Sequence, residues 1–250
     1  MFTPERQQRI IAELAAKGRV EVGELVDLLQ VSEATVRRDL KALAEQGYLQ
    51  KTHGGAVGLD TLYLGWNARA GLHAEAKRRI GKTAASLVEP GQTVILDAGS
   101  TALEAARFLE ARPLTVITNS LDIAQSLEAS PQLTLLLTGG EWDPKVRHFG
   151  GEAALTTLRL FRADWCFLGV SGVHPKAGIT SAYGDNAAVK RAMVTAADRV
   201  VALADASKLG EIAPHFVAGL GEVFAVATED AAKGRELEAA GARLLLAHPS

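Results

Sequence analysis

The stretch Val94–Thr101, with the sequence VILDAGST, decides the fold class of this 250-residue chain. Three apolar residues end at Asp97, small residues follow, and an apolar helical spacing begins at Leu103. This pattern predicts a strand, a tight turn and a helix. Such a turn would place backbone N–H groups, two hydroxyl groups and a helix N-terminus around one point, which favours an anion. The alternative is a helix capped by Ser100 or Thr101 with nothing bound.

The bulk composition predicts a globular chain of one or two domains. Hydrophobic residues make up 48% and charged residues 22%, and the formal net charge is -2, so nucleic-acid binding would need a local basic patch. The single cysteine, Cys166, lies in an apolar run and is expected to be buried. Because no signal peptide or bilayer-spanning run is evident, we expect a cytoplasmic protein without membrane contact.

Residues 1–57 predict a small helical domain with a β-hairpin wing. The expected helices run from about Pro4 to Gly18, over Val22–Leu29, and from the N-cap Ser32 to about Gln46. After Gly47, two short extended runs flank a turn that carries Lys51, His53 and two glycines. Two helices, a short turn and a third helix form a helix-turn-helix arrangement.

The third helix has an apolar face and a cationic face. Helical geometry places Val36, Leu40 and Leu43 on the core side. The opposite side carries Ala34, Arg38, Lys41 and Glu45, with Thr35 and Arg37 on its flanks. From Thr35 to His53, four cations (Arg37, Arg38, Lys41, Lys51) oppose only Asp39 and Glu45. This face suits a DNA major groove, although an ordinary solvated helix face is the alternative.

Residues 5–57 closely resemble the N-terminal winged helix-turn-helix of the DeoR family of bacterial transcription regulators. The most specific segment is Ser32–Leu40, SEATVRRDL, followed by Gly47-Tyr48 and His53-Gly54-Gly55. The resemblance implies double-stranded operator DNA as a partner. The candidate DNA-binding residues are Ser32, Thr35, Arg37, Arg38, Lys41, Lys51 and His53.

Residues 58–75 are expected to form a linker, partly ordered by Tyr63 and Trp66, and residues 76–250 an α/β domain. Seven apolar runs alternate with helical patterns, which predicts a mostly parallel sheet covered on both faces. They are Val94–Leu96, Leu114–Ile117, Leu133–Leu137, Cys166–Val170, Val200–Ala204, Val223–Ala227 and Leu244–Leu246. Ligands of such sheets bind at the carboxyl ends of the strands.

Small and polar residues follow most of these predicted strands. Together they offer N–H groups, hydroxyls, an amide, carboxylates and cations, a set that fits a phosphorylated sugar or polyol. The candidate effector-binding residues are Asp97, Gly99, Ser100, Thr101, Thr118, Asn119, Ser120, Gly139, Gly140, Lys190, Asp205 and Lys208. Routine turn and capping chemistry is the alternative for each cluster.

Residues 76–230 are similar to the effector domain of DeoR-family regulators, whose fold resembles ribose phosphate isomerase. The matching motifs include Asp97–Thr101, Thr118–Ser120 and Val189–Met193. The resemblance implies that Gly99, Ser100 and Thr101 hold the phosphate. One position departs from the family pattern, since Asn186 stands where a glutamate is often found. An amide cannot act as a general base, but it can hydrogen-bond a hydroxyl.

The leading hypothesis is a repressor, working as a homodimer or homotetramer, whose DNA binding responds to a sugar phosphate. It needs neither a catalytic residue nor a cofactor or metal. A sugar-phosphate isomerase with an added DNA-binding domain is the enzymatic alternative, and DNA binding without a ligand is the third. His148, His174 and His215 lack metal-ligand spacing and are expected to be solvated loop residues.

Overall fold

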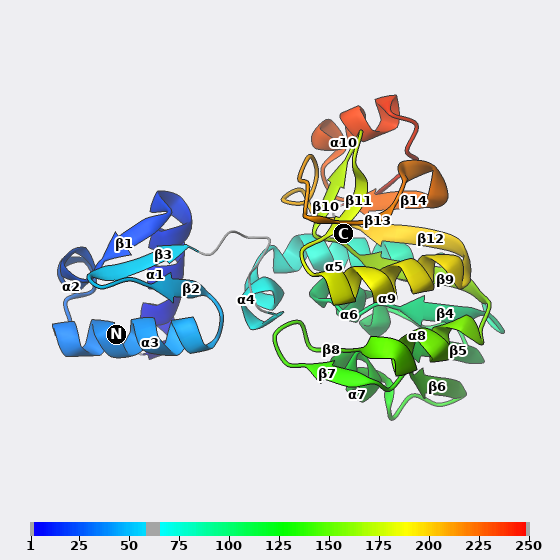
Figure 1. Cartoon of the computed structure of the whole chain (residues 1–250), viewed down its shortest axis with the longest axis horizontal. Helices are drawn as coiled ribbons and strands as arrows, with labels where there is room; N and C mark the ends of the chain where they lie inside the picture. Colours follow the sequence, from blue (N-terminus) through cyan, green and yellow to red (C-terminus); the bar gives the residue numbers. More distant parts are fainter. Residues whose placement is uncertain (1–2, 59–65, 249–250) are drawn as a thin grey trace. The chain divides into compact units, whose positions relative to one another are not determined.

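The computed structural model describes residues 3–58 and 66–248. The chain divides into two compact units, Met1–Leu72 and His73–Ser250, which are described one at a time. Both combine helices with strands (Figure 1). Among the described residues, no helix has the length and apolar character needed to cross a bilayer.

The N-terminal unit contains the predicted helix-turn-helix and wing. Its helices are α1 (Thr3–Lys17), α2 (Val22–Leu29) and α3 (Glu33–Glu45), and its strands are β1 (Arg19–Glu21), β2 (Leu49–Lys51) and β3 (Gly55–Gly58). The bounds of α2 and the hairpin of β2 and β3 confirm the sequence predictions. Ser32 caps α3 as expected, because its Oγ accepts a hydrogen bond from the N–H of Thr35 at 3.3 Å.

One strand of the wing was not predicted. β1 pairs antiparallel with β3, so the wing is a three-stranded sheet with the order β1-β3-β2. A Cβ on Gly55 would lie only 2.0 Å from the carbonyl oxygen of Val20, so this close strand contact requires glycine. The three residues of β1 are too few for a sequence pattern to reveal them.

The stretch expected as a linker is partly helical. α4 spans Trp66–Gly71, and α5 spans Ala74–Ala85 and therefore begins inside the range 58–75. The predicted ordering role of Tyr63 lies outside the described residues.

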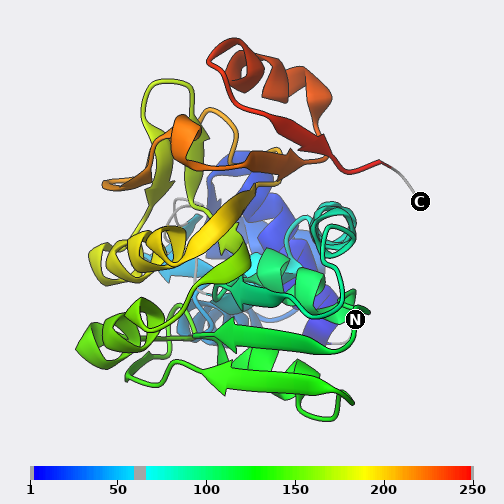
Figure 2. The ribbon, with the colours of Figure 1, turned by 90° about the vertical axis from the view of Figure 1, so that its right-hand side faces the viewer.

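The C-terminal unit is built on a seven-stranded sheet in which every neighbouring pair is parallel. All seven apolar runs predicted as strands belong to it. The strands are β4 (Thr93–Leu96), β5 (Leu114–Thr118), β6 (Leu133–Leu137), β9 (Ala163–Gly169), β12 (Ala197–Leu203), β14 (Ala225–Thr228) and β15 (Leu244–Leu246). Figure 2 shows neighbouring arrows of this sheet pointing the same way.

Helices cover both faces of the sheet, which explains the continuous apolar strands. In Figure 1, α8 (Gly151–Arg159) and α9 (Gly184–Thr195) lie in front of the sheet, and α5 and α6 (Ser100–Arg107) lie behind it. The remaining helices are α7 (Leu121–Leu127) and α10 (Ala231–Ala239). Cys166 is fully buried in the core, as expected, and burial raises the pKa of its thiol.

The strand order, β15-β14-β12-β9-β4-β5-β6, has a topological switch point. From β4 the chain proceeds through β5 to β6, whereas from β9 it proceeds through β12 to β14 in the opposite direction. β4 and β9 are therefore the adjacent strands at which the order reverses. Open sheets of this class bind ligands beside such a point, at the carboxyl ends of the strands.

Short antiparallel strands near this sheet were not predicted. β7 (Glu141–Asp143) pairs with β8 (His148–Gly150) as a hairpin. A separate three-stranded sheet consists of β10 (Gly172–His174), β11 (Gly178–Ser181) and β13 (His215–Ala218). With only three or four residues each, these strands give too little alternation to be recognised in the sequence.

Candidate functional site

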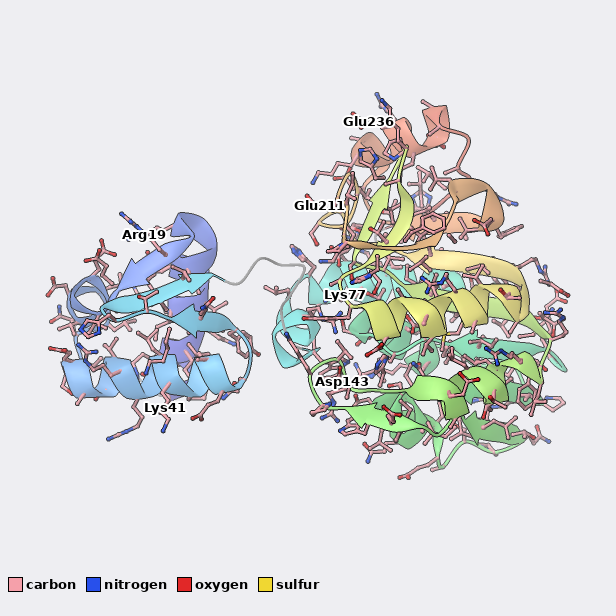
Figure 3. The ribbon with its side chains drawn as sticks, viewed as in Figure 1. Arg19, Lys41, Lys77, Asp143, Glu211 and Glu236 are labelled. Carbon is pink, nitrogen blue, oxygen red and sulfur yellow. The ribbon has the colours of Figure 1, made fainter. Side chains whose placement is uncertain are left out.

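The exposed face of α3 carries the predicted cations. Val36, Leu40 and Leu43 are buried, as the helical spacing predicted. The side opposite them exposes Ala34, Arg38, Lys41 and Glu45. Figure 3 shows Lys41 projecting from α3 away from the rest of the N-terminal unit.

The ion pairs on α3 distinguish its cations. Arg37 pairs with Glu33 at 2.6 Å and Lys41 with Glu45 at 3.8 Å, both between exposed side chains one helical turn apart. Arg38 has no such partner among the described residues. Exposed pairs of this kind contribute little stability, so DNA phosphates can compete for these cations.

Asp39 does not reduce the positive charge of the exposed α3 face, although the sequence analysis counted it against the cations there. The residue is 3% exposed, and its carboxylate pairs with the guanidinium of Arg6 from α1, whose Nη2 lies 3.0 Å from Oδ1. The α3 face therefore presents its cations to solvent while this acid lies in the core. In the wing, Lys51 and His53 are both exposed.

The second candidate site lies at the switch point, where Asp97 follows β4. Asp97 is fully buried, and its Oδ2 accepts hydrogen bonds from the N–H of Gly169 at 3.0 Å and from Nζ of Lys190. Lys190 also donates to the carbonyl of Gly169 at 2.8 Å. Asp97 follows β4, Gly169 ends β9 and Lys190 lies on α9, so only the fold brings these residues together. Oδ1 of Asp97 is buried with no hydrogen-bond partner among the described residues.

The N-terminus of α6 lies directly after Asp97. Its N-cap is Gly99, so the alternative of a cap by Ser100 or Thr101 is wrong, because both residues are inside the helix. Gly99 has no side chain with which to cap the first turn, whose N–H groups remain available. A Cβ at Gly99 would meet nothing within 4 Å, so there is open space beside this turn.

Residues Thr118–Ser120 hold the turn after β4 in place through hydrogen bonds. Asn119 accepts from the N–H of Ala98 at 2.9 Å and donates to the carbonyl of Phe149 at 3.3 Å, which ties the Asp97 loop to β8. Thr118 donates to the carbonyl of Leu96 at 2.7 Å, and Ser120 caps α7. The side chains of these three residues are all engaged within the protein.

The other predicted residues lie further from the switch point. Gly139 and Gly140 follow β6, two strands from β4 on one side, and Asp205 and Lys208 follow β12, two strands from β4 on the other. Four steps between strands correspond to about 19 Å, which is longer than a small sugar phosphate. A Cβ on Gly140 would also lie 2.2 Å from the carbonyl oxygen of Gly150, so a glycine is needed at position 140 for the close backbone contact there. The structure thus does not unite all twelve candidate residues in one site.

His148 is not a solvated loop residue, and that prediction is wrong. It lies on β8 and is 3% exposed, because the hydrogen bond from Asn119 to the carbonyl of Phe149 holds β8 against the Asp97 loop. Burial lowers the pKa of His148, and the nearby Asp97 carboxylate opposes that shift. The loop prediction is also wrong for the other two histidines. His174 ends β10, where its Nδ1 accepts from the N–H of Lys176 at 3.1 Å, and His215 begins β13 and is exposed.

Asn186 belongs to the same cluster. It lies on α9, one turn before Lys190, and is 7% exposed. The spacing of Asn186 and Lys190 was visible in the sequence, but their approach to His148 was not. A three-residue strand with a histidine carries no signal that would have located it at the switch point.

Two family descriptions match almost the whole chain. The DeoR-like helix-turn-helix domain matches residues 6–61, and the DeoR C terminal sensor domain matches residues 72–230. The chain belongs to the DeoR family of transcriptional regulators. Its DNA-binding candidates on α3 thus lie in the DeoR helix-turn-helix, and Asp97, His148 and Asn186 lie in the DeoR sensor domain.

Relatives in the DeoR family align with nearly the whole chain. The HTH-type transcriptional repressor GlcR of Bacillus subtilis is 36% identical over 92% of this chain and 89% of its own length. The uncharacterized regulator FruR of Bacillus subtilis is 35% identical over 92% of both chains. The glycerol-3-phosphate regulon repressor of Escherichia coli is 31% identical, again over 92% of both.

The DeoR sensor domain also resembles solved structures of another class. Ribose 5-phosphate isomerase A of Methanocaldococcus jannaschii aligns with a TM-score of 0.40 and 20% identity over 54% of both chains. This similarity is too weak to carry an argument about function.

Proposed function

We propose that this DeoR-family protein is a repressor of sugar or polyol metabolism genes whose binding to operator DNA is controlled by a phosphorylated sugar. Two relatives support the proposal by name, as they are the GlcR repressor and the glycerol-3-phosphate regulon repressor. The observation that carries it is the uncapped N-terminus of α6 beside Asp97 at the switch point. As a regulator that binds bacterial operators, the protein would act in the cytoplasm.

In the DNA-binding half, α3 enters the major groove and the wing contacts the backbone. Arg38 is the cation best placed for a base edge, since it is exposed and has no ion-pair partner among the described residues. Thr35, Arg37 and Lys41 border it and contact bases or phosphates. Ser32 sets the start of α3, while Lys51 and His53 of the wing approach phosphates or the minor groove.

In the effector half, the phosphate binds at the first turn of α6. Gly99, Ser100 and Thr101 supply N–H groups and two hydroxyls, and the helix dipole adds favourable potential. Asp97 and Lys190, which form an ion pair at the switch point, lie next to this turn. Thr118, Asn119 and Ser120 hold the loop in place. Gly139, Gly140, Asp205 and Lys208 follow strands further along the sheet and are not assigned to the phosphate site.

The regulatory step requires two arrangements of a homo-oligomer, a homodimer or homotetramer in which recognition helices meet repeated half-sites. The effector favours the arrangement that does not bind DNA. The shift cannot exceed the difference in its affinity for the two arrangements.

The protein is proposed to be a sensor and not an enzyme. An isomerase needs a free carboxylate near the substrate carbon. The carboxylate of Asp97 is ion-paired with Lys190, and position 186 carries an amide. Conversion of ribose 5-phosphate by the purified protein would instead support the isomerase alternative.

The direct test is thermal unfolding of the full chain with sugar phosphates and their unphosphorylated parents, including glycerol 3-phosphate. A ligand at about 100 times its dissociation constant adds roughly 2.7 kcal/mol of stability. A phosphate ester that raises the midpoint should then release the protein from operator DNA in a mobility-shift assay. If no phosphate ester in a broad panel shifts the midpoint or releases DNA, the sensor proposal is wrong.

A further inference from the structure

Three buried polar atoms at the switch point have no hydrogen-bond partner among the described residues. They are Oδ1 of Asp97, Nδ1 of His148 and Oδ1 of Asn186. Their residues are 0%, 3% and 7% exposed. Native proteins rarely leave buried polar atoms unsatisfied, because each one costs the free energy of its lost hydration. Three such atoms in one place indicate groups reserved for a ligand.

The fold gathers these atoms from three elements. Asp97 directly follows β4, His148 lies on β8 and Asn186 lies on α9. The imidazole of His148 interacts electrostatically with Asp97 and Lys190 and lies against the amide of Asn186. Asn119 keeps β8 in this position through its bond to Phe149. The strand that carries His148 is thus held beside the Asp97 loop by hydrogen bonds of Asn119 to the backbone.

The chemistry of the cluster defines its ligand. Two of the atoms are oxygen acceptors, and burial lowers the pKa of His148 and so favours its neutral imidazole, in which one ring nitrogen donates and the other accepts. Hydroxyl groups complement this set, because each donates one hydrogen bond and also accepts. A carboxylate or a second phosphate would face Asp97 and an amide oxygen, with which it can form no hydrogen bond.

We infer that Asp97, His148 and Asn186 form a hydroxyl-recognition site, which binds adjacent hydroxyl groups of the effector while its phosphate lies at the first turn of α6. The inference rests on the proposed function and adds His148 and Asn186 as residues that determine specificity. The site selects polyhydroxy phosphates over deoxy analogues and over phosphorylated carboxylic acids. Since the three atoms are shielded from solvent, the effector must displace covering side chains, which costs part of its binding energy.

The test compares matched probes on the full-length protein by calorimetry and thermal unfolding. The probes are inorganic phosphate, ribose 5-phosphate with 2-deoxyribose 5-phosphate, fructose 6-phosphate, and glycerol 3-phosphate with 3-phosphoglycerate. His148→Phe and Asn186→Leu remove the polar atoms and keep similar side-chain volume. His248→Phe and Gln125→Leu are the matched controls, because both replace exposed side chains elsewhere in the same unit.

The wild-type protein and both controls should prefer the hydroxylated member of a probe pair. His148→Phe and Asn186→Leu should each lower the affinity for the hydroxylated probe by about 10- to 100-fold, since a buried hydrogen bond is lost. Both variants should leave the affinity for inorganic phosphate unchanged. Without a probe, both variants should unfold at or above the wild-type midpoint, because an unsatisfied polar atom has been removed.

Two results would overturn the inference while leaving the sensor proposal intact. In the first, phosphate esters bind but the two variants keep the wild-type preference for hydroxyls. In the second, the variants lower the ligand-free midpoint and weaken all probes equally, including inorganic phosphate, which indicates a purely structural role. If the wild-type protein binds none of the probes, the sensor proposal and this inference are both wrong.

Discussion

Replacing Asp39 by alanine is expected to destabilise the N-terminal unit by about 3–5 kcal/mol, because it leaves the Arg6 guanidinium buried without its counter-ion. The two residues are 3% and 8% exposed, and both carboxylate oxygens accept from the guanidinium. A unit of roughly 70 residues has a stability of only roughly 4–11 kcal/mol. At about 4–8 °C per kcal/mol, its unfolding midpoint should fall by at least about 12 °C.

The assay is urea denaturation combined with hydrogen exchange of peptides from α1 and α3, which reports this unit separately. Glu33→Ala is the matched control, since it also removes a carboxylate that pairs with an arginine, but from the exposed surface of α3. The pair of Glu33 and Arg37 is worth only about 0.3–0.5 kcal/mol. Protection of α3 should therefore collapse in the Asp39 variant and change little in the control.

The double variant Arg6→Met with Asp39→Leu separates the buried charge from the loss of packing. Replacing a whole buried ion pair by apolar residues is often neutral or stabilising, so the double variant should recover most of the lost stability. The reasoning is refuted if Asp39→Ala costs no more than Glu33→Ala, or if the double variant is as unstable as the single one.

Three further predictions concern the two candidate sites. Arg38→Ala should weaken operator binding by about 1–3 kcal/mol if Arg38 contacts a base edge, and unchanged affinity in a mobility-shift titration would exclude it from the interface. Ser100→Ala and Thr101→Val should abolish the effector response without altering operator affinity, so a variant that still responds normally would place the phosphate elsewhere. Because burial lowers the pKa of His148, the unfolded chain takes up that proton first, and stability should fall below about pH 6.5 by up to about 1.4 kcal/mol per pH unit. His148→Phe should flatten this slope in urea titrations between pH 5 and 7, whereas His248→Phe should not.

The periodic parts of the fold were predictable because each element carries its own pattern. The helical spacing of Val36, Leu40 and Leu43 predicted the buried face of α3, and the seven apolar runs predicted all strands of the parallel sheet. The family resemblance was confirmed by both domain matches. The strands β1 and β8 were missed because neither is a continuous apolar run and three residues are too few to show the alternation of a half-buried strand.

Charged residues were the least predictable, because a formal charge says nothing about burial. Asp39 looked like an acid on the basic face of α3, and His148 like a loop residue. Both are buried, Asp39 because α1 places Arg6 opposite it, and His148 because Asn119 holds β8 in place. In each case the partner lies about 30 residues away in the chain.

The sequence by itself determined the helices of the N-terminal unit, the strands of the parallel sheet, the family and the residue types of the α6 turn, since these depend on residues adjacent in the chain. Only the tertiary structure decided which strand ends meet. β9 packs beside β4 although β5 and β6 lie between them in the chain, and this order puts the switch point at Asp97. Parallel strands pair through crossovers whose direction no local pattern encodes. The cluster of Asp97, Lys190, His148 and Asn186 is therefore a property of the strand order and not of any single motif.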